Sequence, residues 1–550
     1  MYLATSSEMK MLDRIAIDRF GLPGIVLMEN ASQNIIRAAL EFFYQDRSDW
    51  PPLTRVIVLA GPGQNGGDGW ALARLFAARG FSVSSYLVKA GERGVAGDAA
   101  INLEVVRKMG LSVEVIGAES DPLPDWSQAD LVIDAIFGTG LDRKIEGPAA
   151  RVLQSLGSAK NILDQKLRVL AVDLPSGLSG DSGELLGPPL TADLTVTLGA
   201  PKIGLYLKKG PEVAGKIMVG DIGLTPQMLA LAPPQGRLSG PDELWPYLPE
   251  RPLDGHKGVF GHVLLAGGAQ GKTGALVLAA QGAARSGAAL VTALHPASLG
   301  TIYESKLTEV MTRELPEDEP GQLSEAAGDL ILEYGPGRQA LALGPGLGLG
   351  EGAVRTVRKV VEGLTALPLV LDADALTALA GDLESLKNQP AAVLTPHPGE
   401  AARLLNCSSA DIQNDRLGAA RQIAVLSGAV TVLKGRHTII AEPEGNFYLN
   451  PNGGPHLAVG GSGDLLTGLI VGLLGQGLPP FQAAALGVWV HGRAGDLAAA
   501  ELGPFGLTPS DVLERLPRVW RELADWAAGA GSGRPDCRSQ GHDLLKSCRL

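Results

Sequence analysis

The chain has 550 residues, with 47 Lys and Arg residues against 59 Asp and Glu residues, which gives a formal net charge of −12. This balance excludes a broad surface for nucleic acid or anionic membranes and leaves room only for a local basic site. Hydrophobic residues make up 45% and charged residues 19%, which excludes a disordered chain and predicts a soluble protein of about two to four domains.

The numbers of glycine and cysteine residues further limit the class of protein. Glycine occurs 73 times without a collagen-like period, which indicates turns and loops where the backbone approaches a ligand. The three cysteines, Cys407, Cys537 and Cys548, have no metal-ligand spacing and are too few for a disulfide framework, so we expect a reducing, cytoplasmic setting. No secretion signal is predicted at the N-terminus, and no apolar run reaches the ~20 residues that span a bilayer.

The first part of the chain predicts an α/β domain. Helices are expected at 9–20 and 26–43, before a region in which short apolar strands alternate with helices. Because continuous apolar strands separated by helices form parallel sheets covered on both faces, the pattern favours a three-layer, Rossmann-like arrangement. The strands are expected at 55–60, 81–88, 131–136, 169–174 and 194–198, with helices at 70–79 and 98–109.

A stretch rich in Pro, Leu, Ala and Gly then predicts a linker, after which the alternation starts again. Further strands are expected at 259–266, 340–343, 369–372, 393–395 and 430–433, with helices at 275–286 and 465–474. The Gly/Ser/Arg-rich end of the chain predicts disorder. The expected organisation is a first domain at 1–226, a linker at 227–241, a second α/β domain at 242–526 and a tail at 527–550.

The first strand of the N-terminal domain leads into the glycine-rich segment 61–69, which contains G-x-G-x-x-G. A dehydrogenase is therefore one alternative. One observation argues against a dehydrogenase. The next strand ends at Lys89, where a dehydrogenase carries an acidic residue that binds the ribose of its cofactor. Asn65 and Asp68 also make the segment more polar than a close glycine-to-pyrophosphate contact requires. A tight turn with Asp68 as a helix cap is the other alternative.

Two more strands of this domain end in polar residues. Asp134 precedes the glycine-containing segment 138–144, and Asp173 precedes Ser176. The carboxyl ends of parallel strands meet at one sheet edge, where open α/β sheets bind ligands. Together with Asn65, these residues therefore predict a ligand site.

Four segments carry a resemblance to a known family. Residues 63–69 (GQNGGDG), 134–140 (DAIFGTG) and 172–177 (VDLPSG), preceded by 27–32 (LMENAS), resemble the NAD(P)H-hydrate epimerase domain. The resemblance implies a Rossmann-like fold that is not a dehydrogenase. It also implies binding of hydrated NADH or NADPH (NADHX or NADPHX), in which water has added across the C5–C6 double bond of the nicotinamide.

The resemblance also implies roles for individual residues. Asp173 would hold the nicotinamide end and act as the acid/base group, and Asn65, Asp134 and Ser176 would coordinate K⁺. At Gln64 the family more often carries Asn. The implied substrate contacts are Gln64, Asn65, Gly66, Gly67, Asp68, Gly138, Thr139, Gly140, Leu141, Asp142, Arg143, Lys144 and Asp173.

The second domain begins with a near match to a phosphate-binding loop. Residues 266–273 (AGGAQGKT) fit G-x-x-x-x-G-K-[ST] except that Ala266 replaces the first glycine. A P-loop ATPase, with Asp372 as a Walker-B-like residue, is therefore an alternative.

A second glycine-rich segment, 460–464 (GGSGD), opens the helix expected at 465–474. Free N–H groups at a helix N-terminus favour a phosphoryl group, and an adjacent Asp can deprotonate a hydroxyl for in-line attack. This segment resembles ribokinase-like sugar and vitamin kinases. The alternative is a glycine-rich turn with Asp464 as the N-cap.

More motifs of this domain follow strands. Segments 256–268 (HKGVFGHVLLAGG), 271–275 (GKTGA), 344–348 (GPGLG), 395–400 (TPHPGE) and 434–438 (KGRHT), with GGSGD, resemble the NAD(P)H-hydrate dehydratase domain. In that family GKT is a substrate-side turn. The order of the two domains also resembles the fused bifunctional enzymes of bacteria, and the resemblance covers about residues 1–525.

The dehydratase resemblance implies a ribokinase-like fold and a reaction with ADP. Asp464 would be the catalytic base for phosphorylation of the C6 hydroxyl, and phosphate elimination would give NAD(P)H, AMP and phosphate, with Mg²⁺ bridging the phosphates. Ala275, Gly346, His397 and Asp464 would contact the hydrated dinucleotide. Lys434, Gly435, Arg436, His437, Thr438 and Gly463 would bind the adenine nucleotide.

The two resemblances together imply an isomerase and a lyase on one chain. Hydration yields R and S epimers, the dehydratase acts on the S epimer, and the epimerase supplies it. The expected partners are NADHX, NADPHX and ADP, without nucleic acid or membrane, and we expect a homo-oligomer. The alternatives are a non-catalytic nucleotide-binding sensor and a dehydrogenase/P-loop ATPase fusion.

Overall fold

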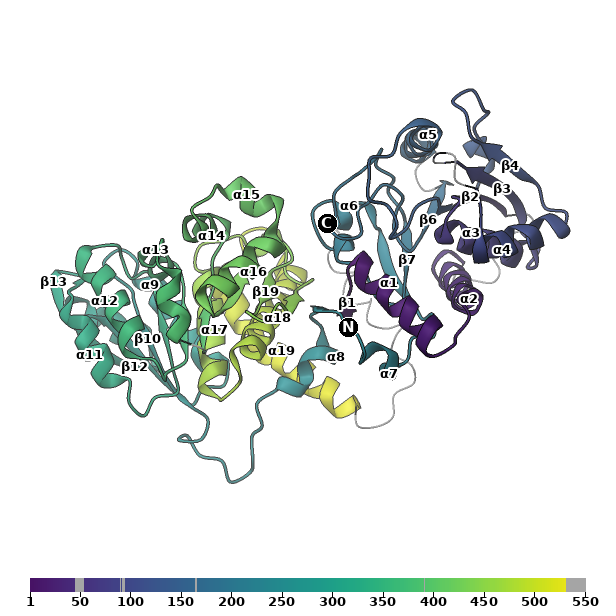
Figure 1. Cartoon of the computed structure of the whole chain (residues 1–550). Helices are drawn as coiled ribbons and strands as arrows, with labels where there is room; N and C mark the ends of the chain where they lie inside the picture. Colours follow the sequence, from purple (N-terminus) through teal and green to yellow (C-terminus); the bar gives the residue numbers. More distant parts are fainter. Residues whose placement is uncertain (45–53, 90, 92–93, 164–165, 390, 531–550) are drawn as a thin grey trace. The chain divides into compact units, whose positions relative to one another are not determined.

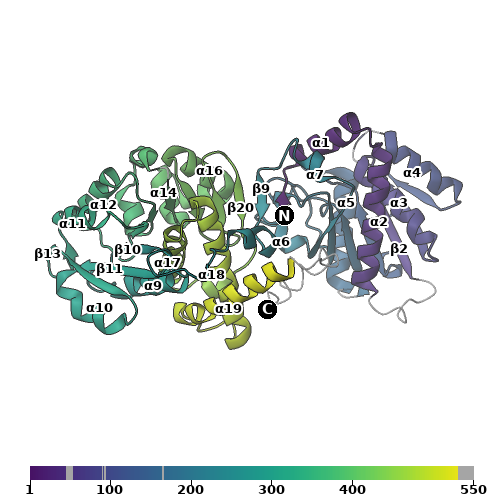
Figure 2. The same cartoon turned by 90° about the horizontal axis from the view of Figure 1, so that it is seen from below.

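The structure is a computed structural model that describes residues 1–44, 54–89, 91, 94–163, 166–389 and 391–530. The chain divides into two compact units between Gly236 and Arg237, inside the stretch where a linker was predicted. The first unit is purple to teal and the second teal to yellow in Figure 1 and, from below, in Figure 2. Each unit is built around its own sheet.

The N-terminal unit contains a seven-stranded sheet with the order β4-β3-β2-β5-β6-β7-β8. Every neighbouring pair is parallel, which confirms the predicted sheet type. The five predicted strands are present, whereas β4 and β8 at the two edges were not predicted. The strands are β2 Arg55–Ala60, β3 Ser82–Val88, β4 Val113–Ile116, β5 Leu131–Ala135, β6 Arg168–Val172, β7 Leu194–Leu198 and β8 Lys216–Gly220.

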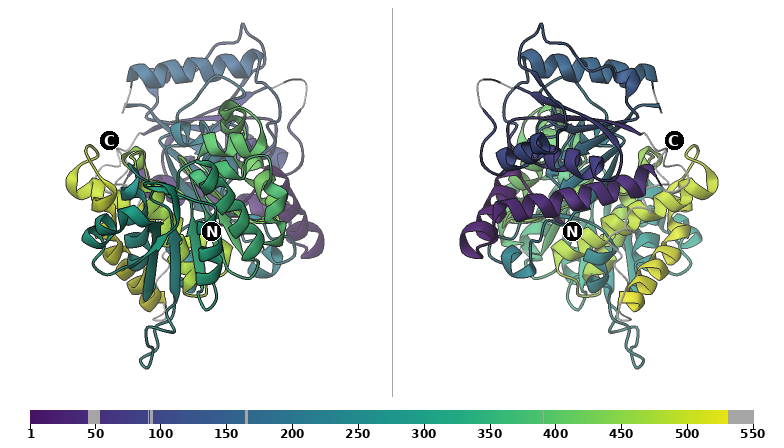
Figure 3. Two further views of the ribbon diagram at one scale, coloured as in Figure 1. Left: turned by 90° about the vertical axis from the view of Figure 1, so that its left-hand side faces the viewer. Right: turned by 90° about the vertical axis from the view of Figure 1, so that its right-hand side faces the viewer.

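Side chains alternate between two helical layers along the central strand β2. Val56 and Val58 belong to a core with residues of α2 (Gly24–Phe43), α3 (Gln64–Ala77) and α4 (Gly97–Lys108). Ile57 and Leu59 belong to a second core with residues of α5 (Gly147–Leu163). The right panel of Figure 3 shows α2 (purple) and α5 (blue) on opposite sides of the sheet. This is the three-layer arrangement that the sequence predicts.

The helices of this unit differ from the predicted ones at their ends. The first runs over α1, Ser6–Arg14, and continues as a π-helical turn, Ile15–Arg19. α3 begins at Gln64, so residues 64–69 form helical turns, where a loop was predicted. The reason is close packing, because a Cβ at Gly66 would lie 1.9 Å from the carbonyl oxygen of Gly61.

The C-terminal unit has a mixed sheet in which the strands from β9 (Gly236–Leu238) onward have the order β9-β20-β19-β18-β17-β16-β15-β10-β11-β12. Pairing is parallel from β12 to β18 and antiparallel from β18 to β20. The strands are β10 His262–Ala266, β11 Leu290–Pro296, β12 Met311–Leu315, β15 Ala340–Leu343, β16 Leu369–Leu371, β17 Ala392–Leu394, β18 Val430–Leu433, β19 Ile439–Ala441 and β20 Phe447–Leu449.

One face of this sheet packs against α9, α17, α18 and α19. Val263 and Leu265 of β10 share a core with Ala279 of α9 and Leu469 of α17. The bounds of these helices are α9 Thr273–Arg285, α17 Ser462–Gly475, α18 Pro480–Leu502 and α19 Pro509–Ala530. α19 thus extends into the stretch predicted as a tail, and residues 531–550 lie outside the described residues. Other helices include α11 Ala326–Tyr334, α12 Glu351–Gly363, α13 Asp374–Ala378, α14 Pro398–Leu405 and α16 Arg416–Ser427.

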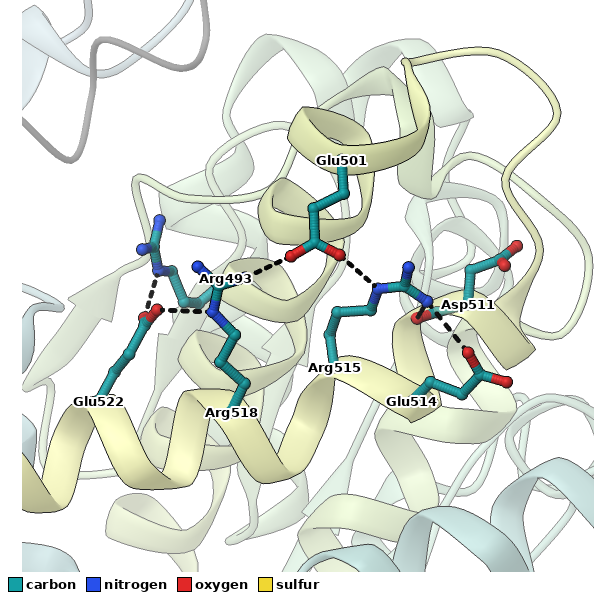
Figure 4. Close-up of polar contacts among 7 residues, drawn as sticks. All are labelled: Arg493, Glu501, Asp511, Glu514, Arg515, Arg518 and Glu522. Carbon is teal, nitrogen blue, oxygen red and sulfur yellow. Dashed lines mark hydrogen bonds and ion pairs between the residues drawn. The ribbon is translucent and has the colours of Figure 1, made fainter.

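Ion pairs connect α18 to α19 (Figure 4). Glu501 at the end of α18 binds Arg515, at 3.2 Å, and Arg518 of α19. Glu522 of α19 accepts from Arg493 of α18 at 3.0 Å and from Arg518 at 3.4 Å. Because these side chains are partly exposed, the network contributes little per pair and mainly fixes the register of the two helices.

Candidate active sites

A cavity of about 1010 Å³ lies in the N-terminal unit at the carboxyl ends of its strands. Residues of the segments after β2 and β5 line it, together with residues of α1 and α2. The predicted substrate residues that line the cavity are Gln64, Asn65, Asp68, Gly138, Thr139, Gly140, Leu141, Asp142, Arg143, Lys144 and Asp173. Gly66 and Gly67 do not line it and instead pack inside α3.

Of the three residues expected to hold K⁺, Asn65 lines this cavity, whereas Asp134 and Ser176 do not line it and bind each other. Ser176 donates to both oxygens of Asp134, through Oγ at 2.6 Å and through its backbone N–H at 2.7 Å. Burial raises the pKa of the Asp134 carboxyl to about 6, against these hydrogen bonds. Nδ2 of Asn65 is buried without a partner in the described part of the chain. A buried carboxylate is a group whose charge a cation would balance, whereas the unpartnered Nδ2 of Asn65 is a donor that needs an acceptor, so only the Oδ1 of this amide could face a cation.

Asp173 forms a buried ion pair with Lys202. Nζ of Lys202 lies 2.5 Å from Oδ1 of Asp173, and Lys202 is 1% exposed. Thr197 Oγ1 and the N–H of Leu198 donate to the same oxygen at 3.2 and 3.0 Å. Asp173 also has a φ of +67°, a strained conformation for a non-glycine residue that is typical of functional sites.

Two more carboxyls line the cavity. Burial, with the nearby charges of Asp173 and Asp13, raises the pKa of Asp68 well above its usual range. Burial also raises the pKa of Asp13 to about 6. Asp68 was predicted from its glycine-rich segment, whereas Asp13 and Lys202 were not predicted, because neither belongs to a glycine-containing motif.

In the C-terminal unit, Asp464 lies in the first turn of α17. Gly461, with a φ of +91°, turns the chain into this helix. A Cβ at Gly463 would lie 3.3 Å from Nζ of Lys434, so the lysine is close to the helix N-terminus. Burial and the charge of Asp372 raise the pKa of Asp464 to about 6, and Lys434 opposes this shift.

Lys434 connects several elements at this edge of the sheet. Its Nζ lies 2.8 Å from Oδ1 of Asp372 and 3.9 Å from Oε2 of Glu400. Burial lowers the pKa of Lys434, but the charges of Asp372 and Glu400 outweigh burial and raise it. Thr467 of α17 donates to Oδ2 of Asp372 at 2.8 Å. Sequence analysis considered Asp372 only for the P-loop alternative and missed Glu400 and Thr467.

The predicted contacts of the hydrated dinucleotide come from three elements. A Cβ at Gly346 would lie 3.1 Å from Cβ of Ala275, so the segment after β15 touches the start of α9. Lys272 of the GKT turn forms an ion pair with Asp374 at 2.9 Å. His397 is the N-cap of α14, and its Nδ1 accepts from Gly399 at 2.9 Å.

The predicted nucleotide segment 434–438 is held by Arg416 of α16. Its guanidinium donates to the carbonyls of Leu433 and Lys434 at 3.2 and 3.3 Å and also binds the carbonyl of Arg436. Burial lowers the pKa of Arg416 to about 10. Arg416 has no motif of its own and was not predicted.

Comparisons with known proteins identify the family of each unit. Residues 263–518 match the family model described as NAD(P)H-hydrate dehydratase, and residues 24–204 match the YjeF-related protein N-terminus. The bifunctional NAD(P)H-hydrate repair enzyme Nnr of Moorella thermoacetica is 42% identical over 97% of this chain and 100% of that protein. The Escherichia coli enzyme of the same name is 34% identical over 92% of each chain.

The chain belongs to the family of bifunctional NAD(P)H-hydrate repair enzymes. This confirms the predicted family and its two enzyme activities, an isomerase and a lyase. It also confirms the Rossmann-like and ribokinase-like fold assignments. The dehydrogenase/P-loop ATPase alternative is excluded.

Solved structures resemble the C-terminal half. The ADP/ATP-dependent NAD(P)H-hydrate dehydratase from Bacillus subtilis is 29% identical, covers 52% of this chain and 97% of its own, and has a TM-score of 0.44. A ribokinase-like superfamily protein from Enterococcus faecalis is 26% identical, covers 52% of this chain and 96% of its own, and has a TM-score of 0.46. Among the described residues, no helix combines the length and apolar character needed to cross a bilayer.

Proposed function

We propose that the bifunctional enzyme repairs NADHX and NADPHX in two steps, one in each unit. The N-terminal unit interconverts the R and S epimers, and the C-terminal unit uses ADP to convert the S epimer to NAD(P)H, AMP and phosphate. The observation that carries the proposal is that each unit pairs an aspartate with a lysine at the carboxyl edge of its sheet. The pairs are Asp173 with the buried Lys202 in the N-terminal unit and Asp372 with the half-buried Lys434, which lies beside the helix that carries Asp464, in the C-terminal unit. Open α/β sheets bind their ligands at this edge.

In the C-terminal unit, Asp464 is the base for the C6 hydroxyl. Its pKa is about 6, so the carboxylate is ionised at neutral pH. A general base is most efficient when its pKa lies near the working pH, and this value meets that condition. The free N–H groups in the first turn of α17 stabilise the transferred phosphoryl group, and Lys434 adds a positive charge beside them.

Other residues of the dehydratase site would bind the two substrates. Ala275, Gly346 and His397 would hold the hydrated dinucleotide, and Lys434, Gly435, Arg436, His437, Thr438 and Gly463 would hold ADP. When bound, Mg²⁺ would neutralise phosphate charge. The described residues contain no cluster of three His, Cys, Asp or Glu side chains that could hold a metal, so the phosphates would supply most of its ligands.

In the N-terminal unit, Asp173 would hold the nicotinamide end of the substrate and exchange protons with it. Asn65, Asp134 and Ser176 would hold K⁺, whose positive charge would compensate the buried Asp134 and fix the neighbouring glycine-rich segments. The other substrate contacts would come from residues 64–68 and 138–144. A cytoplasmic homo-oligomer remains our expectation, and sedimentation equilibrium would measure the oligomeric state.

An absorbance assay at 340 nm tests this proposal. Purified enzyme is mixed with both epimers of NADHX, Mg²⁺ and either ADP or ATP. Full recovery of NADH with ADP supports both activities and the phosphoryl donor. Recovery that stops at the S fraction would contradict the epimerase assignment, and no recovery with either nucleotide would contradict the dehydratase assignment.

A further inference from the structure

Four ionisable side chains from four separate segments line the N-terminal cavity. They are Asp13 of α1, Asp68 of α3, Asp173 after β6 and Lys202 after β7. Three are carboxyls and one is a cation, so only one of the acids can have its charge balanced within the group. The position of Lys202 therefore decides which carboxylate has its charge balanced.

The ion pair selects Asp173. Lys202 is 1% exposed, its Nζ lies 2.5 Å from Oδ1 of Asp173, and it also donates to the carbonyl of Leu198 at 2.8 Å. The donors to Asp173 within the described residues, Lys202, Thr197 and Leu198, all bind Oδ1. Oδ2 is thus left to accept a proton from a ligand in the cavity.

Asp68 is in the opposite situation. It is 6% exposed, and its Oδ1 has no hydrogen-bond partner in the described part of the chain. Burial together with the charges of Asp173 and Asp13 raises its pKa well above the usual range. Burial and these charges therefore favour the protonated form of Asp68, which can donate a proton.

We propose, on the basis of the epimerase function proposed above, that Lys202 is a positioning residue that holds Asp173 as the proton-accepting carboxylate and leaves Asp68 as the neutral proton donor. Two carboxyls with opposite protonation states in one cavity form an acid–base pair. Such a pair can catalyse epimerisation at C6 by opening and reclosing the ring, because that route removes one proton and adds another.

The chemistry balances without a co-reactant. In the hydrated ring C6 carries a hydroxyl and is bonded to N1. Asp173 takes the hydroxyl proton, the C6–N1 bond breaks with its electron pair going to N1, a carbonyl forms at C6, and Asp68 protonates N1. After rotation about C5–C6, N1 attacks the other face of the carbonyl and both protons return, which gives the other epimer.

Other charged residues line the same cavity but differ in exposure. Lys10, Asp142, Arg143, Lys144 and Glu146 are exposed, and Asp98 is half-buried. Solvent and salt screen their charges, so they shift the protonation of the buried group less than Lys202 does. None of these charges should therefore compensate for the loss of the Lys202 ammonium when that residue is substituted.

The test uses the full-length enzyme with Lys202→Met, Lys202→Arg and, as a matched control, Lys209→Met. Lys209 is an exposed lysine of the same unit that pairs with Glu212 at 2.8 Å. Epimerisation of pure R-NADHX is measured by chromatographic separation of the epimers from pH 5 to 9. Dehydration of S-NADHX by the same sample reports whether the other unit is intact.

For Lys202→Met we expect kcat for epimerisation to fall at least about tenfold at pH 7, with KM changed less than about twofold. Because Lys202 is the cation that balances Asp173, its removal should change the shape of the pH profile as well as the rate. Lys202→Arg should restore part of the rate. Lys209→Met should behave like the wild type.

A wild-type pH profile in Lys202→Met would overturn the proposal, and so would an equal loss at every pH. If Lys202→Met fails to fold, Asp68→Asn gives the deciding result, because it preserves shape and removes the donated proton. We expect that variant to lose at least about a hundredfold in kcat, and wild-type activity would again overturn the proposal. Absence of epimerisation in the wild type would instead contradict the proposed function itself.

Discussion

Lys434 and Asp372 form an ion pair at the carboxyl edge of the C-terminal sheet, with Nζ 2.8 Å from Oδ1 and Asp372 only 1% exposed. Thr467 occupies the other carboxylate oxygen at 2.8 Å. With both oxygens engaged, Asp372 positions Lys434 and is not available as a base. Asp464 has no side-chain hydrogen bond within the described residues, which fits the role of a base for substrate.

Asp372→Asn should therefore impair dehydration without affecting epimerisation. The substitution leaves Lys434 without its nearest anion, and breaking a buried pair of this kind costs about 3 kcal/mol. We expect a lower free energy of unfolding for the C-terminal unit and a fall in the dehydratase kcat/KM of at least about tenfold. Urea unfolding and separate assays of the two activities measure both effects. Asp329→Asn, which alters an exposed pair with Lys359, is the matched control and should change neither quantity.

The pH dependence of dehydration should follow Asp464. Its pKa is about 6 and its carboxylate must be ionised to act as a base, so the rate should rise as pH increases through 6 and then level off. Lys434 lowers this pKa, and Lys434→Met should therefore move the midpoint to higher pH. Steady-state kcat measured from pH 5 to 8 checks both statements. An unchanged midpoint in Lys434→Met would argue against this electrostatic link.

Potassium should stabilise the N-terminal unit above pH 6. Folding raises the pKa of Asp134 from its ordinary value to about 6, so the ionised carboxylate costs stability, and this cost grows as pH rises from about 4 to about 6. A bound cation offsets the cost. Thermal unfolding should show a higher Tm in KCl than in tetramethylammonium chloride at pH 7.5 and a smaller difference at pH 5. Asp134→Asn should abolish the dependence on K⁺, whereas a dependence that survives would place the cation elsewhere.

The ion pairs between α18 and α19 should contribute only modestly. Glu501 is 38% exposed and binds Arg515 and Arg518 (Figure 4). Glu501→Gln should lower the free energy of unfolding of the C-terminal unit by about 0.5–1 kcal/mol, and less in high salt. Urea titrations at low and high NaCl test this. A loss of about 3 kcal/mol would mean that the network is a central support of the unit.

Site residues that lie together in one short motif could be predicted from the sequence. Apolar strands that end in glycine and carboxyl residues specify a parallel sheet edge, and this pattern predicted Asp134 and Asp173 as site residues. Asp464 was predicted from a glycine-rich segment that opens a helix. The same emphasis on glycine misplaced the start of α3. The glycines at its beginning serve close packing against Gly61, a tertiary requirement that looks like a loop signal in the sequence.

Residues that act through distant partners could not be predicted. Lys202 is 29 positions from Asp173, and Thr467 is 95 positions from Asp372. A lysine or threonine outside a motif resembles any surface residue until folding buries it beside a charge. Arg416 is similar, because its function is to bind backbone carbonyls of a loop that follows it in the sequence.

The central claim is that two separate sites act in sequence on one substrate. The most direct measurement starts from pure R-NADHX with ADP and Mg²⁺ and follows absorbance at 340 nm. The wild type should form NADH completely. Asp173→Asn and Asp464→Asn should each form it only at the rate of spontaneous epimerisation or not at all, and a mixture of the two variants should restore complete conversion. Complete conversion by either variant alone, or none by the mixture, would contradict the account.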